Sequence, residues 1–173
     1  SLTYNVRGWL TGKESTPFRM CLRYATPEGG SAARWNGSLS EWEWQHGTNA
    51  AMMYGLTYDG LNRFTGAVQK QKNGNTWSAL SGDYVEKGLT YDRNGNLLTL
   101  QRTAGGSVVD NLAYTYTGNQ LTGLSESVRT APSNDIYAPG NAESGSYSYD
   151  ANGNLQNDSR KSLNFSYNFL NLV

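Results

Sequence analysis

A three-residue motif recurs along this chain and restricts its fold more than any other feature: an apolar residue, one spacer residue and a tyrosine. Alternate side chains of a β-strand point to opposite faces, so the apolar residue and the tyrosine share one face while the spacer points to the other. The spacer is Thr or Ser in six of the seven copies. The copies are Leu2-Thr3-Tyr4, Leu22-Arg23-Tyr24, Leu56-Thr57-Tyr58, Leu89-Thr90-Tyr91, Tyr114-Thr115-Tyr116, Tyr147-Ser148-Tyr149 and Phe165-Ser166-Tyr167. The motif therefore predicts a chain built from repeated short strands.

Most copies lead into a turn sequence rich in Asp, Asn and Gly. Asp92-Arg93-Asn94-Gly95-Asn96 follows Tyr91, and Asp150-Ala151-Asn152-Gly153-Asn154 follows Tyr149. Gly and Asn tolerate positive φ, and an Asp before a turn caps the backbone amides, so these segments predict hairpins. The residues assigned to this structural motif are Tyr4, Tyr58, Asp59, Gly60, Tyr91, Asp92, Asn94, Gly95, Tyr116, Gly118, Tyr149, Asp150, Asn152 and Gly153. Second strands are expected to begin at Leu10, Phe64, Leu97, Leu121 and Leu155.

No window has a helical period, so we predict an all-β fold whose repetitive antiparallel hairpins form a twisted, spiralling sheet. The whole chain, residues 1–173, is interpreted as one repeat domain. Trp35-Asn36-Gly37-Ser38-Leu39 is interpreted as a degenerate copy with Trp in place of Tyr. The long connection at 125–145, rich in Gly, Ser and Asn, is predicted to be a flexible loop. The basic run Lys70-Gln71-Lys72 is predicted to lie at a solvated hairpin tip.

The composition argues against several functional classes. Lys+Arg and Asp+Glu both number 14, and this zero net charge argues against a nucleic-acid binder. No apolar run is long enough to span a bilayer. The single cysteine, Cys21, permits no internal disulfide. Because the chain begins at Ser1 and ends in an apolar run, we expect it to be a piece of a larger protein, so the lack of a visible secretory signal says nothing about export.

The sequence resembles the YD repeats of the RHS family. Tyr91-Asp92-Arg93-Asn94-Gly95-Asn96-Leu97 and Tyr149-Asp150-Ala151-Asn152-Gly153-Asn154-Leu155 look like one common form of that repeat. Tyr58-Asp59-Gly60-Leu61-Asn62-Arg63-Phe64 looks like the other. Asn5-Val6-Arg7-Gly8-Trp9-Leu10 is similar to a segment common in RHS proteins of Bacteroidetes. The resemblance covers nearly the whole chain and is weakest between residues 13 and 54.

This resemblance implies a β-ribbon wound in a spiral, which in complete members of the family closes into a hollow shell around a toxic C-terminal segment. It implies a non-enzymatic structural role, with the rest of the parent chain and its cargo as partners. It also implies a secreted or cell-surface location, and YD repeats have been credited with carbohydrate binding. Many members carry an aspartate-proline motif linked to self-cleavage, but this chain has no Asp-Pro pair, so that activity is not carried over.

Few residues suggest catalytic or metal-binding chemistry. Cys21 falls in an ordinary strand sequence and His46 in a turn sequence, without the surroundings of a thiol nucleophile and its base. The Asp-x-Asn-Gly turns lack the ligand spacing of a calcium loop. Glu41 and Glu43 share a strand face about 7 Å apart, which fits alternating surface charge better than a glycosidase pair. We therefore predict no catalytic residue, no metal and no cofactor.

Two tryptophans alternate with these glutamates. Trp42 and Trp44 share the opposite strand face, and two interpretations stay open. Their rings pack between layers or cover an edge, or else they stack on sugars and make the chain a carbohydrate-binding module at the cell surface. The uncapped edges of such a sheet also predict edge-to-edge self-association.

Overall fold

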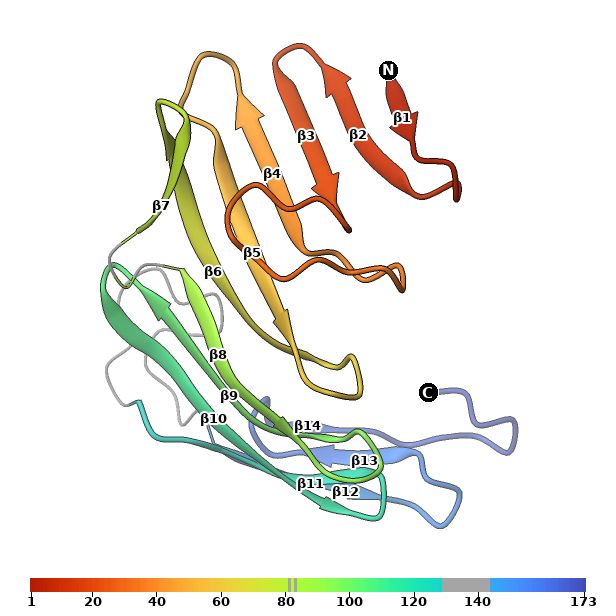
Figure 1. Ribbon diagram of the computed structural model, residues 1–173. Helices are drawn as coiled ribbons and strands as arrows, with labels where there is room; N and C mark the ends of the chain where they lie inside the picture. Colours follow the sequence, from red (N-terminus) through yellow and green to blue (C-terminus); the bar gives the residue numbers. More distant parts are fainter. Residues whose placement is uncertain (81, 83, 129–143) are drawn as a thin grey trace. The chain divides into compact units, whose positions relative to one another are not determined.

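The computed structural model describes residues 1–80, 82, 84–128 and 144–173, and every regular element in them is a β-strand (Figure 1). The paired strands are antiparallel, which confirms the predicted all-β class. The described part of the chain contains no helix, and hence none that could cross a membrane. The strands are β1 (Leu2–Tyr4), β2 (Leu10–Ser15), β3 (Phe18–Arg23), β4 (Glu41–His46), β5 (Met52–Tyr58), β6 (Phe64–Asn73), β7 (Thr76–Ala79), β8 (Val85–Tyr91), β9 (Leu97–Ala104), β10 (Ser107–Thr117), β11 (Gln120–Glu126), β12 (Gly145–Tyr149), β13 (Leu155–Asp158) and β14 (Leu163–Asn164).

The strands divide into two compact units. The first comprises Ser1–Lys87 and Gly105–Ser107, and its strands follow chain order from β1 to β6. Both β7 and the start of β8 pair with β6. In the second unit, Gly88–Ala104 and Val108–Val173, the rest of β8 is followed by β9 to β14, each bonded to the next. Within each unit, spatial neighbours are mostly sequence neighbours, as expected for hairpins laid side by side.

The strand boundaries follow the repeat. Four strands end on the repeat tyrosine, at Tyr4, Tyr58, Tyr91 and Tyr149. Four predicted second strands begin at the expected residue, namely Leu10, Phe64, Leu97 and Leu155, and Leu121 is the second residue of β11. The register shifts beside the turn in the hairpins of Tyr4, Tyr58, Tyr116 and Tyr149. Such a shift marks a β-bulge, so turn and bulge form one recurring unit.

A recurring glycine allows the two strands of a hairpin to pack closely on the spacer face. Three of these glycines lie opposite the spacer threonine: Gly12 opposite Thr3, Gly66 opposite Thr57 and Gly123 opposite Thr115. An added Cβ would lie 2.8, 3.2 and 2.5 Å, respectively, from the threonine Oγ1. The Leu/Phe-Thr-Gly sequence that begins these second strands therefore follows from the lack of space beside the spacer.

One connection in the first unit departs from the short turns. Residues 24–40, here called the β3–β4 insertion, join two strands without a strand of their own. Trp35–Leu39 falls within it, so its interpretation as a degenerate hairpin copy is wrong. Instead, Gly37 adopts φ 94° and the Ser38 N–H donates to Asn36 Oδ1 at 3.1 Å. The asparagine thus closes a local turn on its own backbone rather than starting a strand pair.

The basic run lies within a strand, so its prediction as a solvated tip is wrong. β6 extends through Lys70, Gln71 and Lys72 to Asn73 and pairs there with β7. Lys70 Nζ donates to the carbonyl of Gly29 in the insertion, and Lys72 Nζ lies 5.4 Å from the Trp77 ring centroid. The run therefore pairs along the last part of β6, and the hairpin turn itself follows it at Gly74 and Asn75.

The predicted flexible connection at 125–145 lies mainly outside the described residues. Of its ends, Ser125 and Glu126 belong to β11, and Gly145 begins β12.

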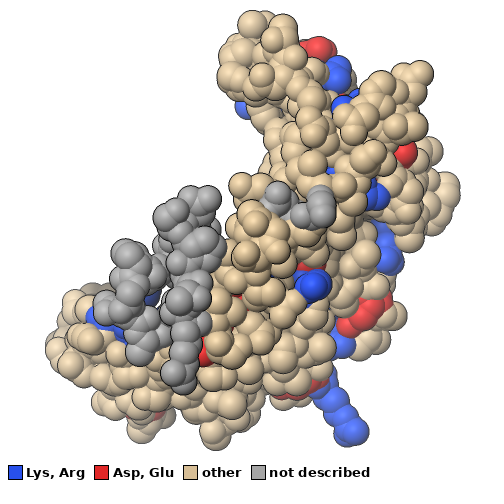
Figure 2. Space-filling model, turned by 90° about the vertical axis from the view of Figure 1, so that its left-hand side faces the viewer, with Lys and Arg blue, Asp and Glu red and all other residues tan. Residues whose placement is uncertain are grey.

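The buried apolar set is small. Among the residues that the structure describes, it consists of Ala51, Met53, Ala67, Val109 and Leu124. On the face shown in Figure 2, acidic and basic side chains are interspersed among a majority of uncharged residues. A sheet that buries little apolar surface fits the mean hydropathy of −0.63.

Candidate functional site

The Asp-x-Asn-Gly sequences form a hydrogen-bonded turn that the aspartate organises. In the copy at Asp92, the Asp92 N–H donates to Asn96 O and the Gly95 N–H donates to Asp92 O. The Asp92 carboxylate accepts the N–H groups of Asn94 and Asn96 at 2.9 and 2.8 Å and the side-chain amide of Asn96 at 2.7 Å. Gly95 adopts φ 90°. This is a three-residue loop closed by a left-handed residue, one of the common hairpin connections.

The same turn recurs at Asp150 and Asp59, with one correction to the predicted motif. The Asp150 carboxylate makes the three equivalent bonds at 2.8–2.9 Å. At Asp59, the Arg63 guanidinium replaces the asparagine amide, with Nε 2.7 Å from Oδ2. Gly60 was assigned to the motif for its tolerance of positive φ, but Asn62 adopts that conformation, at φ 61°. The residue with left-handed backbone is the third after the aspartate, because the last residue of a three-residue hairpin loop adopts that conformation and forms the bulge.

Two further copies use asparagine in place of aspartate. Asn5 Oδ1 accepts the N–H groups of Arg7 and Trp9 at 2.9 and 3.0 Å. Asn168 Oδ1 accepts those of Leu170 and Leu172 at 2.8 and 3.2 Å. The Asn168 copy was not predicted, although its Asn-x-x-Asn spacing matches Asp59-x-x-Asn62 and could have revealed it.

Turn asparagines also connect neighbouring tips in the second unit. Gly118, at φ 61°, begins the two-residue loop after Thr117. Asn119 in that loop accepts the side-chain amides of Asn94 and Asn96 at 3.0 and 3.1 Å. In the same way, Asn171 accepts those of Asn152 and Asn154 at 3.4 and 2.9 Å. The asparagines therefore join adjacent hairpins in addition to shaping each turn.

Three of the repeat tyrosines join their hairpin to the preceding one through the hydroxyl group. Three phenols donate to the carbonyl of the first apolar residue after the preceding turn or loop: Tyr24 to Leu10 at 2.8 Å, Tyr149 to Leu121 at 2.9 Å and Tyr167 to Leu155 at 2.8 Å. Tyr4, in the first hairpin of the chain, is 58% exposed. The phenol thus ties each of these hairpins to the backbone of the one before it.

The turn carboxylates make stability depend on acid pH. Hydrogen bonds hold the pKa of each below the usual value of about 3.9. The largest cause is the side-chain amide four residues on for Asp92 and Asp150, and the backbone N–H of Arg63 for Asp59. A lowered folded-state pKa gives stability that is present above the unfolded-state pKa and is lost as pH falls through the folded-state pKa. We expect the Tm from circular dichroism to fall below about pH 4. The fall should be smaller in Asp92→Asn, and an equal fall in both proteins would contradict this role.

Trp42 and Trp44 lie together on one face of β4, as the alternation predicted. Their ring centroids are 5.4 Å apart, and the Trp44 centroid is 5.3 Å from that of Tyr54 on β5. The three rings form a row, in which Trp42 is 40% exposed. Packing and sugar stacking both remain predictions for this row.

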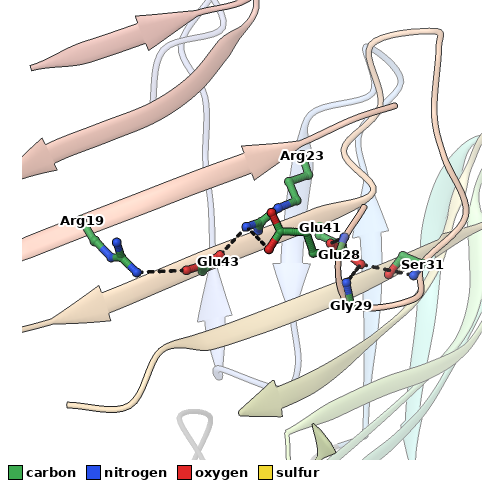
Figure 3. Close-up of polar contacts among 7 residues, drawn as sticks. All are labelled: Arg19, Arg23, Glu28, Gly29, Ser31, Glu41 and Glu43. Atoms are coloured by element: carbon green, nitrogen blue, oxygen red, sulfur yellow. Dashed lines mark hydrogen bonds and ion pairs between the residues drawn. The ribbon is translucent and has the colours of Figure 1, made fainter. Parts of the chain in front are cut away.

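The glutamates on the opposite face of β4 are buried, so their interpretation as surface charge is wrong. Glu41 is 0% and Glu43 is 5% exposed. The Glu41 carboxylate accepts the N–H groups of Glu28, Gly29 and Ser31 at 2.7, 2.8 and 3.2 Å (Figure 3). These bonds hold the middle of the β3–β4 insertion against the sheet. Strand alternation could not reveal the burial, because a distant segment covers this face.

The second glutamate is paired with arginines of β3. Arg23 Nη2 lies 2.6 Å from Glu43 and 2.9 Å from Glu28, while Arg19 Nη2 lies 3.4 Å from Glu43 (Figure 3). The Arg23 side chain is only 10% exposed, so removing Glu43 would leave a buried guanidinium paired with the more exposed Glu28 and should be destabilising. The carboxylates of Glu41 and Glu43 are therefore engaged with fixed donors, an arrangement that suits structure rather than acid–base chemistry.

The remaining candidates for chemistry lie on β3 and β4. Burial raises the pKa of the Cys21 thiol, with Arg23 opposing the effect, and a protonated thiol is a weak nucleophile. His46 ends β4 and pairs with Phe18. Among the residues that the structure describes, no group of three or more His, Cys, Asp or Glu is placed to hold a metal ion.

A pocket of about 670 Å³ lies between the first turn and the β3–β4 insertion. The Trp9 ring packs against Tyr24, with centroids 5.1 Å apart, and the Arg7 guanidinium lies 5.1 Å from the Trp9 centroid. Arg7 Nη1 also donates to the carbonyl of Trp35 at 2.7 Å. No sequence motif indicated this pocket, because only folding brings the turn and the insertion together.

No protein-family model matches the chain, and no curated protein matches it. The likeness to YD repeats therefore rests on the sequence motifs.

Proposed function

We propose that this chain is a non-enzymatic structural segment of the RHS/YD-repeat type. Its hairpins would form part of a protein wall that encloses or presents a C-terminal, toxin-like segment of a secreted or surface-located parent protein. The observation that supports this most is the recurring bond from a tyrosine hydroxyl to the preceding hairpin. Equivalent links between successive units suit a modular wall, because the stability of such a structure is a sum of nearest-neighbour terms.

A wall of this kind excludes proteases by keeping its backbone paired. Arg19, Arg23 and Lys70 lie within hydrogen-bonded strands, and their side chains contact other groups of the first unit. Trypsin would need local opening of the sheet to reach these sites, so cleavage would follow the population of the open state.

The test is trypsin digestion of the protein and of Tyr149→Phe, followed by mass spectrometry. Removing the phenol should cost about 1 kcal/mol, since the Leu121 carbonyl loses its donor. We expect cleavage after Arg102 to accelerate about fivefold. The control is Tyr4→Phe, in the exposed first hairpin, which should be cleaved at the wild-type rate. Rapid cleavage of the wild-type strands, or equal rates in the two variants, would contradict the proposal.

The alternative function is glycan recognition by the row of Trp42, Trp44 and Tyr54. The exposure of Trp42 and the 5.3–5.4 Å spacing of the tilted rings favour it, since neighbouring aromatic rings with one exposed member offer an apolar surface to a sugar. Binding on a glycan array that disappears in Trp42→Ala, with an unchanged Tm, would support this alternative over the wall.

A further inference from the structure

We propose that the pocket between the first turn and the β3–β4 insertion binds a small organic acid. Its carboxylate would be attached to a ring that has a flat apolar face. This inference goes beyond the wall and does not depend on it. It rests on three features of the first unit: a long anchored insertion, two arginines without carboxylate partners, and an exposed indole. The lining residues that carry the argument are Arg7, Trp9, Tyr24, Glu28, Arg34 and Trp35.

The insertion is an addition that the hairpin pattern does not require. The other connections from β1 to β7 contain five residues or fewer, whereas this one spans residues 24–40. It is nevertheless anchored firmly: Glu41 binds three of its N–H groups, Ser40 Oγ donates to Ala32 O at 2.8 Å, and Lys70 Nζ donates to Gly29 O. A long connection that has no strands of its own and makes specific contacts with the sheet is typical of a functional loop.

The charges on the pocket wall favour an anion. Glu28 is neutralised by Arg23, with 2.9 Å between Nη2 and the carboxylate. Neither Arg7 nor Arg34 forms an ion pair with any residue in the described ranges. Arg34 instead lies over the Tyr58 ring at 4.6 Å, and its buried Nε has no hydrogen-bond partner there. The two guanidinium groups thus supply unneutralised positive charge, and their planar donor set matches a carboxylate.

The aromatic residues select a ligand with a ring. Trp35 is 67% exposed and lines the same pocket as Arg7, whose guanidinium donates to the Trp35 backbone carbonyl. Trp9 is already packed, because an added Cβ at Gly37 would lie 3.3 Å from its ring. The free surface for stacking is therefore that of Trp35. The pocket volume falls in the range of small-molecule sites. An acidic sugar and an aromatic acid share this chemistry.

The test is calorimetric titration of the whole protein with digalacturonate and, separately, with phenylacetate. The methyl esters of both acids serve as neutral probes. We expect at least one acid to bind and its ester to bind about tenfold more weakly, because the guanidinium contacts need the charge. Whichever acid binds shows whether the natural ligand is an acidic sugar or an aromatic acid. No saturation by either acid up to about 10 mM, or equal affinity for acid and ester, would overturn the proposal.

Variants locate the site. Arg7→Gln and Trp35→Ala should each weaken binding of the acid about tenfold. Trp35→Ala removes a largely exposed ring, so its fold should persist even if Arg7→Gln loses stability through the bond to the Trp35 carbonyl. Phe169→Ala, which removes an exposed aromatic ring that does not line the pocket, should bind with wild-type affinity. Binding unaffected by Trp35→Ala, or weakened equally by Phe169→Ala, would contradict this location.

Discussion

Replacing Glu41 by alanine should lower the free energy of unfolding by about 3 kcal/mol or more. The substitution removes one fully buried carboxylate and leaves the N–H groups of Glu28, Gly29 and Ser31 without their acceptor. Each hydrogen bond to a charged group contributes about 1.5–3 kcal/mol, and part of the loss is recovered if the insertion moves away from the sheet and its amides meet water.

Urea unfolding followed by tryptophan fluorescence measures this loss, and hydrogen exchange locates it. The amides of the three donors should exchange faster in Glu41→Ala than in the wild type. Glu14→Ala is the matched control, because the Glu14 side chain is exposed on β2 and should change stability little. Glu41→Gln should fall between the two, since its amide oxygen still accepts hydrogen bonds. A Glu41→Ala protein as stable as Glu14→Ala would refute the anchoring role.

Replacing Gly66 by alanine should cost about 1–3 kcal/mol. Its φ lies outside the left-handed region, so backbone conformation does not oppose alanine. The obstacle is space: a Cβ would lie 2.7 Å from the backbone oxygen of Glu86 on β8 and 3.2 Å from Thr57 Oγ1. Backbone oxygen cannot rotate away as a side chain can, so the strands must separate locally.

Gly60→Ala is the control for this effect. Gly60 lies in the turn between the same two strands that contain Thr57 and Gly66, and nothing lies within 4 Å of its added Cβ. Alanine there should be neutral or slightly stabilising, because it restricts only the unfolded chain. Thermal unfolding of the two variants compares them directly. A similar Tm for both would show that close packing at Gly66 is unimportant.

The strand and turn predictions succeeded where the signal was local. The turn at Asp92 is determined within five residues, because its carboxylate bonds the amides of Asn94 and Asn96 and Gly95 supplies the left-handed backbone. The role of Gly60 was predicted wrongly, since Asp-Gly alone does not say where in the loop the left-handed residue falls. Asn62 filled that position because loop length, rather than the presence of a glycine, fixes it.

The sequence alone therefore determined that the chain is all-β, where most hairpins turn, and that Trp42 and Trp44 share a strand face. Those properties depend on alternation and on turn chemistry between residues close in the chain. Only the tertiary structure decided that the Glu41 carboxylate is buried, that Tyr149 bonds the Leu121 carbonyl, and that Arg7 meets Trp35 at a pocket. Each of these joins segments 10 to 28 residues apart. A contact of that kind depends on how the β3–β4 insertion and the hairpins pack, which no local pattern of residues encodes.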